Sequence, residues 1–272
     1  MNLLKTKALL HNTITKEYRN KALLFLLIFS LGVITLANAL VNFISETFLV
    51  NNPQAAILGD KSFFVMFMVI TFLTTLISVI LGTSCIKSDF ESSSIGQILA
   101  FPIQRVEYLG ARIIGAWITS IMFFIISIGY TAFLFSLSTK ASFISGPVIL
   151  AILTASANLL TTITIAAILS LYLPKLFAFI FTFAIRILIG SSNAYFAKDS
   201  FSEIFQDMSV LKFFGAMIHF FFPRMQPMEV FTKELLEGKS VGLDNIALFG
   251  QYFVTYIILF SLLSLFFSRK EI

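Results

Sequence analysis

The sequence is short of the residues that build soluble folds, disulfide frameworks and metal centres. Of its 272 residues, 12% are charged, against roughly a quarter in soluble domains. A single cysteine, Cys85, excludes an internal disulfide and any multi-cysteine zinc site, and His11 and His219 are the two histidines. These shortages argue against a soluble globular domain and against a structural metal site.

Motifs for catalysis are also missing. The chain has no G-x-x-x-x-G-K-[ST] loop to hold nucleotide phosphates and no H-E-x-x-H pair for a zinc protease. The run Gly190-Ser191-Ser192 is an incomplete G-x-S-x-G, and its one candidate base is His219, on a segment that the sequence cannot place beside it. We therefore predict that the chain is not an enzyme and binds no cofactor.

Long apolar runs are what the sequence contains instead. Hydrophobic residues make up 58% of the chain, and 33 residues are Phe. A membrane-spanning helix needs about 20 apolar residues, because each residue rises about 1.5 Å through a hydrocarbon layer of about 30 Å. We predict an all-α integral membrane protein, a single transmembrane domain over residues 1–272, with six spans at approximately 22–44, 62–84, 112–137, 147–172, 176–196 and 246–267.

The segment before the first span has its own pattern. Its basic side chains lie on other faces than a set of apolar residues near helical spacing, which are Leu3, Leu10, Ile14 and Tyr18. Residues 1–21 are therefore expected to form an amphipathic helix in the cytoplasmic membrane interface. An alternative is a cleaved signal peptide, since Lys21, the apolar run 22–36 and Ala37-Asn38-Ala39 resemble its three regions.

Residues 197–245 form a longer connection before the last span. Its apolar piece, Val210 to Phe222, is too short to cross a bilayer and is interrupted by Lys212. Backbone exposed to lipid would leave polar groups unpaired, so we expect a re-entrant or interfacial segment buried against the bundle, on the extracytoplasmic side. A seventh span is the alternative.

Lys and Arg residues in short flanks set the orientation. With six alternating spans, most of them fall on one side: Lys5, Lys7, Lys16, Arg19, Lys21, Lys87, Arg105, Arg112, Lys175, Arg269 and Lys270. Both termini are therefore expected in the cytoplasm of a multi-pass membrane protein. The net charge is +5, but the Lys and Arg residues form no basic stripe with interleaved aromatics, so nucleic acid is not an expected partner.

The cytoplasmic loop at residues 86–111 is longer than a chain reversal requires. Its apolar residues are spaced as in a short amphipathic helix that Pro102 stops: Ile95, Ile98, Leu99 and Phe101. Charged residues follow it into the third span. Such a helix offers a surface to a cytoplasmic partner.

This run resembles the permeases of type-2 ABC exporters, whose loop after the second span has an acidic residue, small residues, a Leu-rich turn and then Pro-[Leu/Ile]-x-Arg-x-Glu-Tyr. The matching positions are Glu91, Ser94, Ile98, Leu99, Pro102, Ile103, Arg105, Glu107, Tyr108 and Arg112. The segments Lys16–Arg19, Phe222–Arg224 and Phe266–Glu271 also resemble the family in order along the chain. Gly96-Gln97 departs from the family pattern.

The resemblance implies a permease subunit in the inner membrane of a bacterium. Two copies, identical or paralogous, would associate in the lipid bilayer, and a separate ATP-binding cassette subunit would hydrolyse ATP. The implied docking residues for that subunit are Glu91, Ile98, Leu99, Pro102, Arg105, Glu107 and Arg112.

Two other functions stay open. A gradient-driven transporter or channel usually carries an acid or a His inside its spans, and none of the six predicted spans has one well inside it. This favours the ABC interpretation over a gradient-driven one. A non-transporting membrane scaffold or assembly protein is excluded by no residue.

Arg186 and two polar stripes are the candidates for a translocation path. Arg186 lies near the middle of the fifth span, so it is expected to face the bundle or water, as a structural donor or as a contact for an anionic substrate. A shorter, bent helix that brings it nearer the surface is the alternative. Small polar residues recur at helical spacing in two other spans: Thr71, Thr74 or Thr75, Ser78 and Gly82, and then Thr154, Asn158 and Thr161, followed by Ile165. Such stripes commonly pack helices together, and Asn158 is the best candidate for both packing and path.

Overall fold

The computed structural model describes residues 3–19, 21–49, 62–93, 95–96, 103–139, 146–196, 209–236 and 244–270. These residues are almost entirely helical, with no strand among them. Six of the described helices are long and apolar enough to cross a membrane. The all-α class and the six candidate spans are thereby confirmed.

The six long helices are α2 (Lys21–Leu49), α4 (Ser62–Cys85), α7 (Arg105–Thr139), α8 (Gly146–Tyr172), α9 (Lys175–Tyr195) and α13 (Asp244–Arg269). Five of them begin close to the expected residue, but α7 begins at Arg105 and not near 112. The expectation followed the apolar run, whereas helix formation continues through charged residues. Glu107 lies in the first turn of α7, where a negative charge favours the helix dipole. Part of the expected loop is therefore helix.

Four shorter helices complete the described chain: α1 (Leu3–Tyr18), α5 (Lys87–Glu91), α11 (Val210–Phe221) and α12 (Met225–Leu236). The 12 residues of α11 extend about 18 Å at 1.5 Å a residue, which is too short for a bilayer of about 30 Å. The structure therefore gives no support to a seventh span at this segment.

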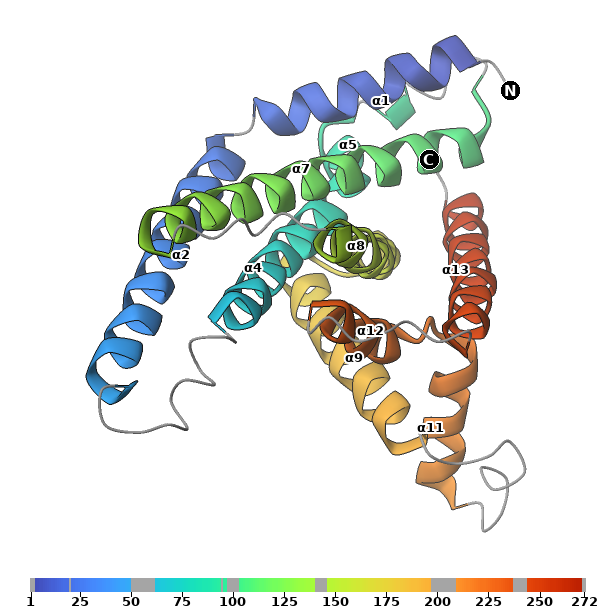
Figure 1. The fold of residues 1–272 in the computed structure, drawn as a ribbon. Helices are drawn as coiled ribbons and strands as arrows, with labels where there is room; N and C mark the ends of the chain where they lie inside the picture. Colours follow the sequence, from blue (N-terminus) through green and yellow to red (C-terminus); the bar gives the residue numbers. More distant parts are fainter. Residues whose placement is uncertain are drawn as a thin grey trace.

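Helix α8 lies at the centre of the bundle, surrounded by α4, α7, α9, α12 and α13 (Figure 1). It is buried along most of its length, and many of its buried residues are Ala, Ser or Thr. Small side chains let neighbouring helices approach closely. The closest approach is to α4, where a Cβ built on Gly82 would lie 2.7 Å from Cβ of Ala166 and 2.7 Å from the carbonyl oxygen of Ile163.

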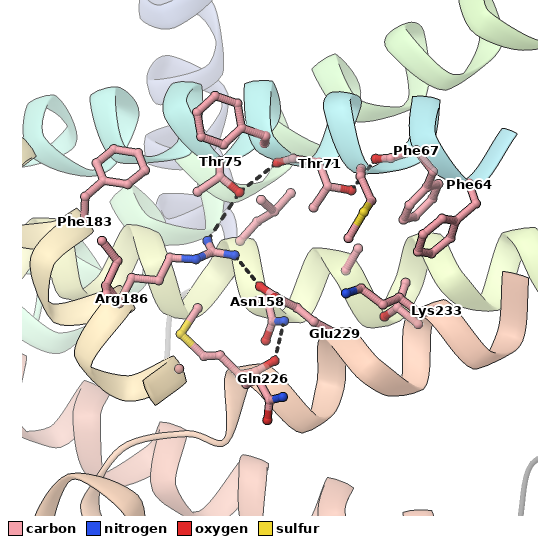
Figure 2. Close-up of a pocket in the computed structure, with 18 residues that line it drawn as sticks. Phe64, Phe67, Thr71, Thr75, Asn158, Phe183, Arg186, Gln226, Glu229 and Lys233 are labelled. Carbon is pink, nitrogen blue, oxygen red and sulfur yellow. Dashed lines mark hydrogen bonds and ion pairs between the residues drawn. The ribbon is translucent and has the colours of Figure 1, made fainter. Parts of the chain in front are cut away.

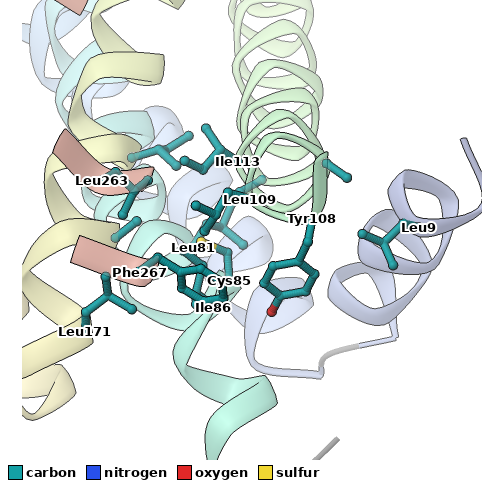
Figure 3. Close-up of a cluster of buried hydrophobic side chains, with 14 of the residues drawn as sticks. Leu9, Leu81, Cys85, Ile86, Tyr108, Leu109, Ile113, Leu171, Leu263 and Phe267 are labelled. Atoms are coloured by element: carbon teal, nitrogen blue, oxygen red, sulfur yellow. The ribbon is translucent and has the colours of Figure 1, made fainter. Parts of the chain in front are cut away.

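One end of the bundle gathers the elements that the sequence assigns to the cytoplasm. A buried apolar cluster there joins α1, α4, α7, α8 and α13, with Tyr108 stacked on Phe267 at a centroid distance of 5.6 Å (Figure 3). Arg105 donates a 2.9 Å hydrogen bond to the carbonyl of Ser268, and Lys270 donates to the carbonyl of Leu171. The first turn of α7 and the ends of α8 and α13 therefore meet at the same end.

Helix α1 packs along the first turns of α7 (Figure 1). The face that it buries carries Leu9, Thr13 and Glu17, which is not the apolar stripe expected from the sequence. Tyr18 of that stripe is 79% exposed. A Cβ built on Gly115 of α7 would lie 2.7 Å from the Thr13 methyl group, so a glycine permits the close contact with α1.

Helices α11 and α12 lie in the other half of the bundle. The Asn158 amide, near the middle of α8, donates a 3.1 Å hydrogen bond to the carbonyl of Met225, at the start of α12. Further along α12, the hydroxyl of Thr232 shares a 2.8 Å hydrogen bond with that of Thr154, nearer the start of α8. Helix α11 packs on the last turns of α9 through Ser192. The turn between α11 and α12 reaches mid-bundle, because Met225 contacts the middle of α8.

Candidate functional site

A cavity of about 420 Å³ opens between α4, α8, α9 and α12 (Figure 2). A volume in this range is typical of small-ligand sites. Its wall combines Phe and Met side chains with hydroxyl, amide and charged groups. Among the described residues it brings together both sequence candidates for a translocation path, Asn158 and Arg186.

Arg186 links three neighbouring helices across this cavity. Its guanidinium donates to the hydroxyls of Thr162 at 3.0 Å and Thr75 at 3.3 Å. A third bond, of 2.6 Å, joins it to a carboxylate oxygen of Glu229 on α12 (Figure 2). The Arg186 side chain is 18% exposed, so its position satisfies the expectation that a mid-span arginine faces the bundle.

Asn158 lies at the inner end of α12. Its amide nitrogen caps the carbonyl of Met225, and its amide oxygen is buried without a hydrogen-bond partner among the described residues. The other polar residues of the α8 stripe bind neighbouring helices, because Thr154 pairs with Thr232 and Thr161 shares a 2.6 Å hydrogen bond with Tyr252. This stripe therefore mainly packs α8 against α12 and α13.

The polar stripe of α4 divides between two roles. Thr71 and Thr75 line the cavity, and each donates its hydroxyl proton to a carbonyl of its own helix. Thr74 and Ser78 are fully buried, and Gly82 contacts α8. Thr71 and Thr75 thus face the cavity, while Thr74, Ser78 and Gly82 lie in the packed interior of the bundle.

Glu229 and Lys233 are cavity residues that the sequence reasoning missed. They belong to the predicted connection at residues 197–245, in which the sequence analysis named no site residue. The signal that identifies them is periodicity: in α12 the charged face carries Gln226, Glu229 and Lys233, and the opposite face carries buried apolar residues. This amphipathic pattern predicts a helix with one polar face.

The expected docking residues differ in how exposed they are, and some lie outside the described residues. Glu91 and Arg105 are exposed and Glu107 is half-buried. Ile98, Leu99 and Pro102 lie outside the described residues. Exposed side chains around residues 91–93 and 104–106 therefore provide the part of this surface that the structure describes.

Arg112, also expected at the docking surface, is 2% exposed and lies inside the bundle. It pairs with Asp89 at 2.5 Å and donates a 2.8 Å hydrogen bond to the Thr13 hydroxyl. Asp89 also accepts from the Tyr108 hydroxyl at 2.6 Å and pairs with Lys16 at 3.0 Å. We refer to Asp89, Arg112, Tyr108, Lys16 and Thr13 as the Asp89 network, which joins α1, α5 and α7.

Near the end of α9, Ser192 and His219 each contact another group. The Ser192 hydroxyl donates to the carbonyl of Gly215 at 2.7 Å, and the His219 ring lies 3.1 Å from the amide oxygen of Asn193. Within the described ranges, no three His, Cys, Asp or Glu side chains gather as a set of metal ligands.

The described chain is thus an all-helical protein with six potential membrane spans and a charged cavity at mid-bundle. Comparison with protein-family models and with curated proteins finds no match to this chain.

Proposed function

We propose that this protein is the permease subunit of an exporter, embedded in the inner membrane of a bacterium and driven by a separate ATP-binding cassette subunit. The observation that carries the proposal is the cavity at mid-bundle, where Arg186 and Glu229 form an ion pair between apolar helices. Ionisable groups at membrane depth are costly, and they mark substrate paths in transport proteins. The resemblance of the 86–112 run to type-2 ABC permeases supports the identity of the energy source.

The α11–α12 pair would act as a re-entrant hairpin entering from the outer face. Its turn reaches the middle of α8, and irregular backbone at that depth is tolerated where it is buried in protein or lines a cavity. Helix α12 would then form the outer wall of the path. A second copy of the permease would associate with this one in the bilayer.

Helix α4 would connect the energy source to the path. Its cavity residues Thr71 and Thr75 lie on the same helix whose last turn leads into α5. The Asp89 network fastens α5 to α1 and α7. A force applied at the docking surface is therefore transmitted to α4 and to α7 together. Helix α1 would lie in the cytoplasmic interface, with the exposed Tyr18 toward lipid headgroups.

The proposal places both termini in the cytoplasm, because the Lys- and Arg-rich elements meet at one end of the bundle. In a Cys85→Ala background, Ser209→Cys should react with a membrane-impermeant maleimide added to intact cells, and Ser268→Cys should react only after lysis. Both serines are exposed and lie at opposite ends. Labelling of Ser268→Cys from outside would reverse this orientation.

Docking of the ATP-binding subunit is expected to depend on Ile98 and Leu99. Apolar residues at the centre of an interface supply most of its affinity, while rim charges such as Glu91 and Arg105 steer the encounter. The variant Ile98→Asp/Leu99→Asp should abolish co-purification of the ATP-binding subunit from native membranes. The subunit is identified by mass spectrometry through its phosphate-binding loop, and the complex is assayed for ATP hydrolysis.

The matched control is Ile98→Val/Leu99→Met, which keeps both side chains apolar and should keep the ATP-binding subunit bound. Size-exclusion chromatography checks that both variants remain folded. If the Asp variant retains the subunit with native affinity, the docking assignment is wrong. If no ATP-binding subunit co-purifies even with the unaltered chain, the proposed energy source is wrong.

A gradient-driven transporter is the second candidate, and Glu229 is the observation that favours it. The sequence showed no acid inside the spans, but the folded chain places this carboxylate in the cavity beside Arg186. Carboxylates at this depth carry protons in coupled transporters. Proton flux through the purified chain alone in liposomes, lost in Glu229→Gln, would support this candidate over the ATP-driven one.

A further inference from the structure

The cavity carries an excess of positive charge. Among the described residues that line it, three are charged: Arg186, Lys233 and Glu229. With Lys and Arg each counted as +1 and Glu as −1, the sum is +1. An unbalanced positive charge at a cavity favours a ligand of opposite sign.

The cavity also holds hydrogen-bond donors that have no partner among the described residues. Glu229 is already paired with Arg186, whereas the described residues provide no hydrogen bond or ion pair to Lys233. An ammonium group has three N–H donors. The amide of Gln226 on the same face of α12 is likewise without a partner among the described residues, and it offers two donors and an acceptor oxygen.

Most of the remaining lining residues are apolar, and the cavity continues to the outer surface of the bundle. Phe64, Phe67 and Phe183 line the cavity with their rings (Figure 2). Two further lining residues, Phe72 and Ile187, are 59% and 67% exposed. The cavity therefore opens between α4 and α9 onto a surface that contacts lipid chains in a membrane.

We propose that this cavity binds an anionic amphiphile, with its carboxylate or phosphate headgroup at Lys233 and Arg186 and its apolar tail between α4 and α9. This inference rests on the proposed transport function and assigns that function a substrate class. Charged hydrogen bonds hold the headgroup, and the phenylalanine rings and Ile187 cover the first part of the tail. Glu229 keeps Arg186 oriented and limits the attraction for the headgroup.

Equilibrium binding to the purified full chain in a neutral detergent tests the ligand class. Decanoate, decanol and decylamine have the same chain with a negative, neutral and positive headgroup at neutral pH. Decanoate should bind about tenfold more tightly than the other two, because one hydrogen bond between charged groups is enough for that difference. Acetate and inorganic phosphate, which lack a tail, should bind more weakly than decanoate.

Variants separate the site from general charge effects. Lys233→Gln should weaken decanoate binding about tenfold, whereas Lys212→Gln, on α11 and outside the cavity lining, should leave it unchanged. Glu229→Gln should tighten decanoate binding, because it removes the carboxylate that competes for Arg186. These opposite directions do not follow from a loss of folding.

Competition in phosphatidylcholine nanodiscs identifies the source of the ligand. Displacement of decanoate by added phosphatidylglycerol indicates a bilayer lipid, and binding without displacement indicates a free amphiphile; both results support the class. Equal affinity for decanol or decylamine, equal affinity for phosphate alone, or decanoate binding unaffected by Lys233→Gln would each overturn the inference. Because the measurement needs no ATPase, its failure leaves co-purification of the ATP-binding subunit as an independent test of the exporter.

Discussion

Replacing Asp89 with Ala should lower the stability of the protein more than any other single truncation at the end of the bundle where α1, α5 and α7 meet. The carboxylate pairs with Arg112 at 2.5 Å, and both side chains are 2% exposed. Removal of one partner leaves an uncompensated buried charge, which costs about 3–5 kcal/mol. The Tyr108 hydroxyl would also lose its acceptor. In detergent, the unfolding midpoint followed by size-exclusion chromatography should fall by roughly 10 °C.

Glu91→Ala is the matched control, two residues along the chain. Glu91 pairs with Lys175, but the two side chains are 49% and 44% exposed, so the loss should stay within about 1 kcal/mol. The double variant Asp89→Ala/Arg112→Leu should recover part of the stability, because it removes the orphaned charge. A midpoint for Asp89→Ala equal to that of Glu91→Ala would contradict the buried-pair argument.

Gly82→Ala is expected to separate α4 from α8 at their closest contact. The added methyl group would lie 2.7 Å from both the Ile163 carbonyl oxygen and the Ala166 methyl group. Neither atom belongs to a flexible side chain, so the helix backbones must move. Overpacking of this kind costs about 1–3 kcal/mol. The same thermal measurement should show a lower midpoint, and Gly82→Leu should reduce the yield of folded protein further.

Gly129→Ala provides the comparison within the same fold. Gly129 lies in α7, where an added Cβ would meet no atom within 4 Å. Alanine is the better helix former by roughly 1 kcal/mol in peptides, so this variant should match or exceed the stability of the unaltered chain. If both alanine variants behave alike, close packing at Gly82 is not a determinant of the bundle.

The long helices were predictable because a local property determines them. An apolar run of about 20 residues is sufficient to predict a spanning helix, whatever its neighbours are. The run that contains Arg186 was assigned correctly for this reason. Helix ends were less accurate where charged residues extend the helix beyond the apolar run, as at Arg105 of α7. The packing of α1 on α7, which buries Thr13 and Glu17, was not predicted.

The candidate site was predictable in part. The sequence identifies Asn158 and Arg186 as candidates, because polar residues inside apolar runs are rare. Glu229 and Lys233 do not, since they lie in a mixed segment among other charges. Asp89 was not identified either, because it lies in a predicted loop and the sequence does not show that it pairs with Arg112 inside the bundle.

The sequence by itself determined the class of the protein, the six long helices and the polar residues that cannot face lipid. These follow from composition and from patterns within single stretches of the chain of about 20 residues. Only the tertiary structure decided which of these charges are paired. Arg186 is paired by a residue 43 positions away, and Lys233 enters the same cavity without a partner among the described residues. Such pairings depend on the packing of helices remote in the sequence, and no local pattern specifies them.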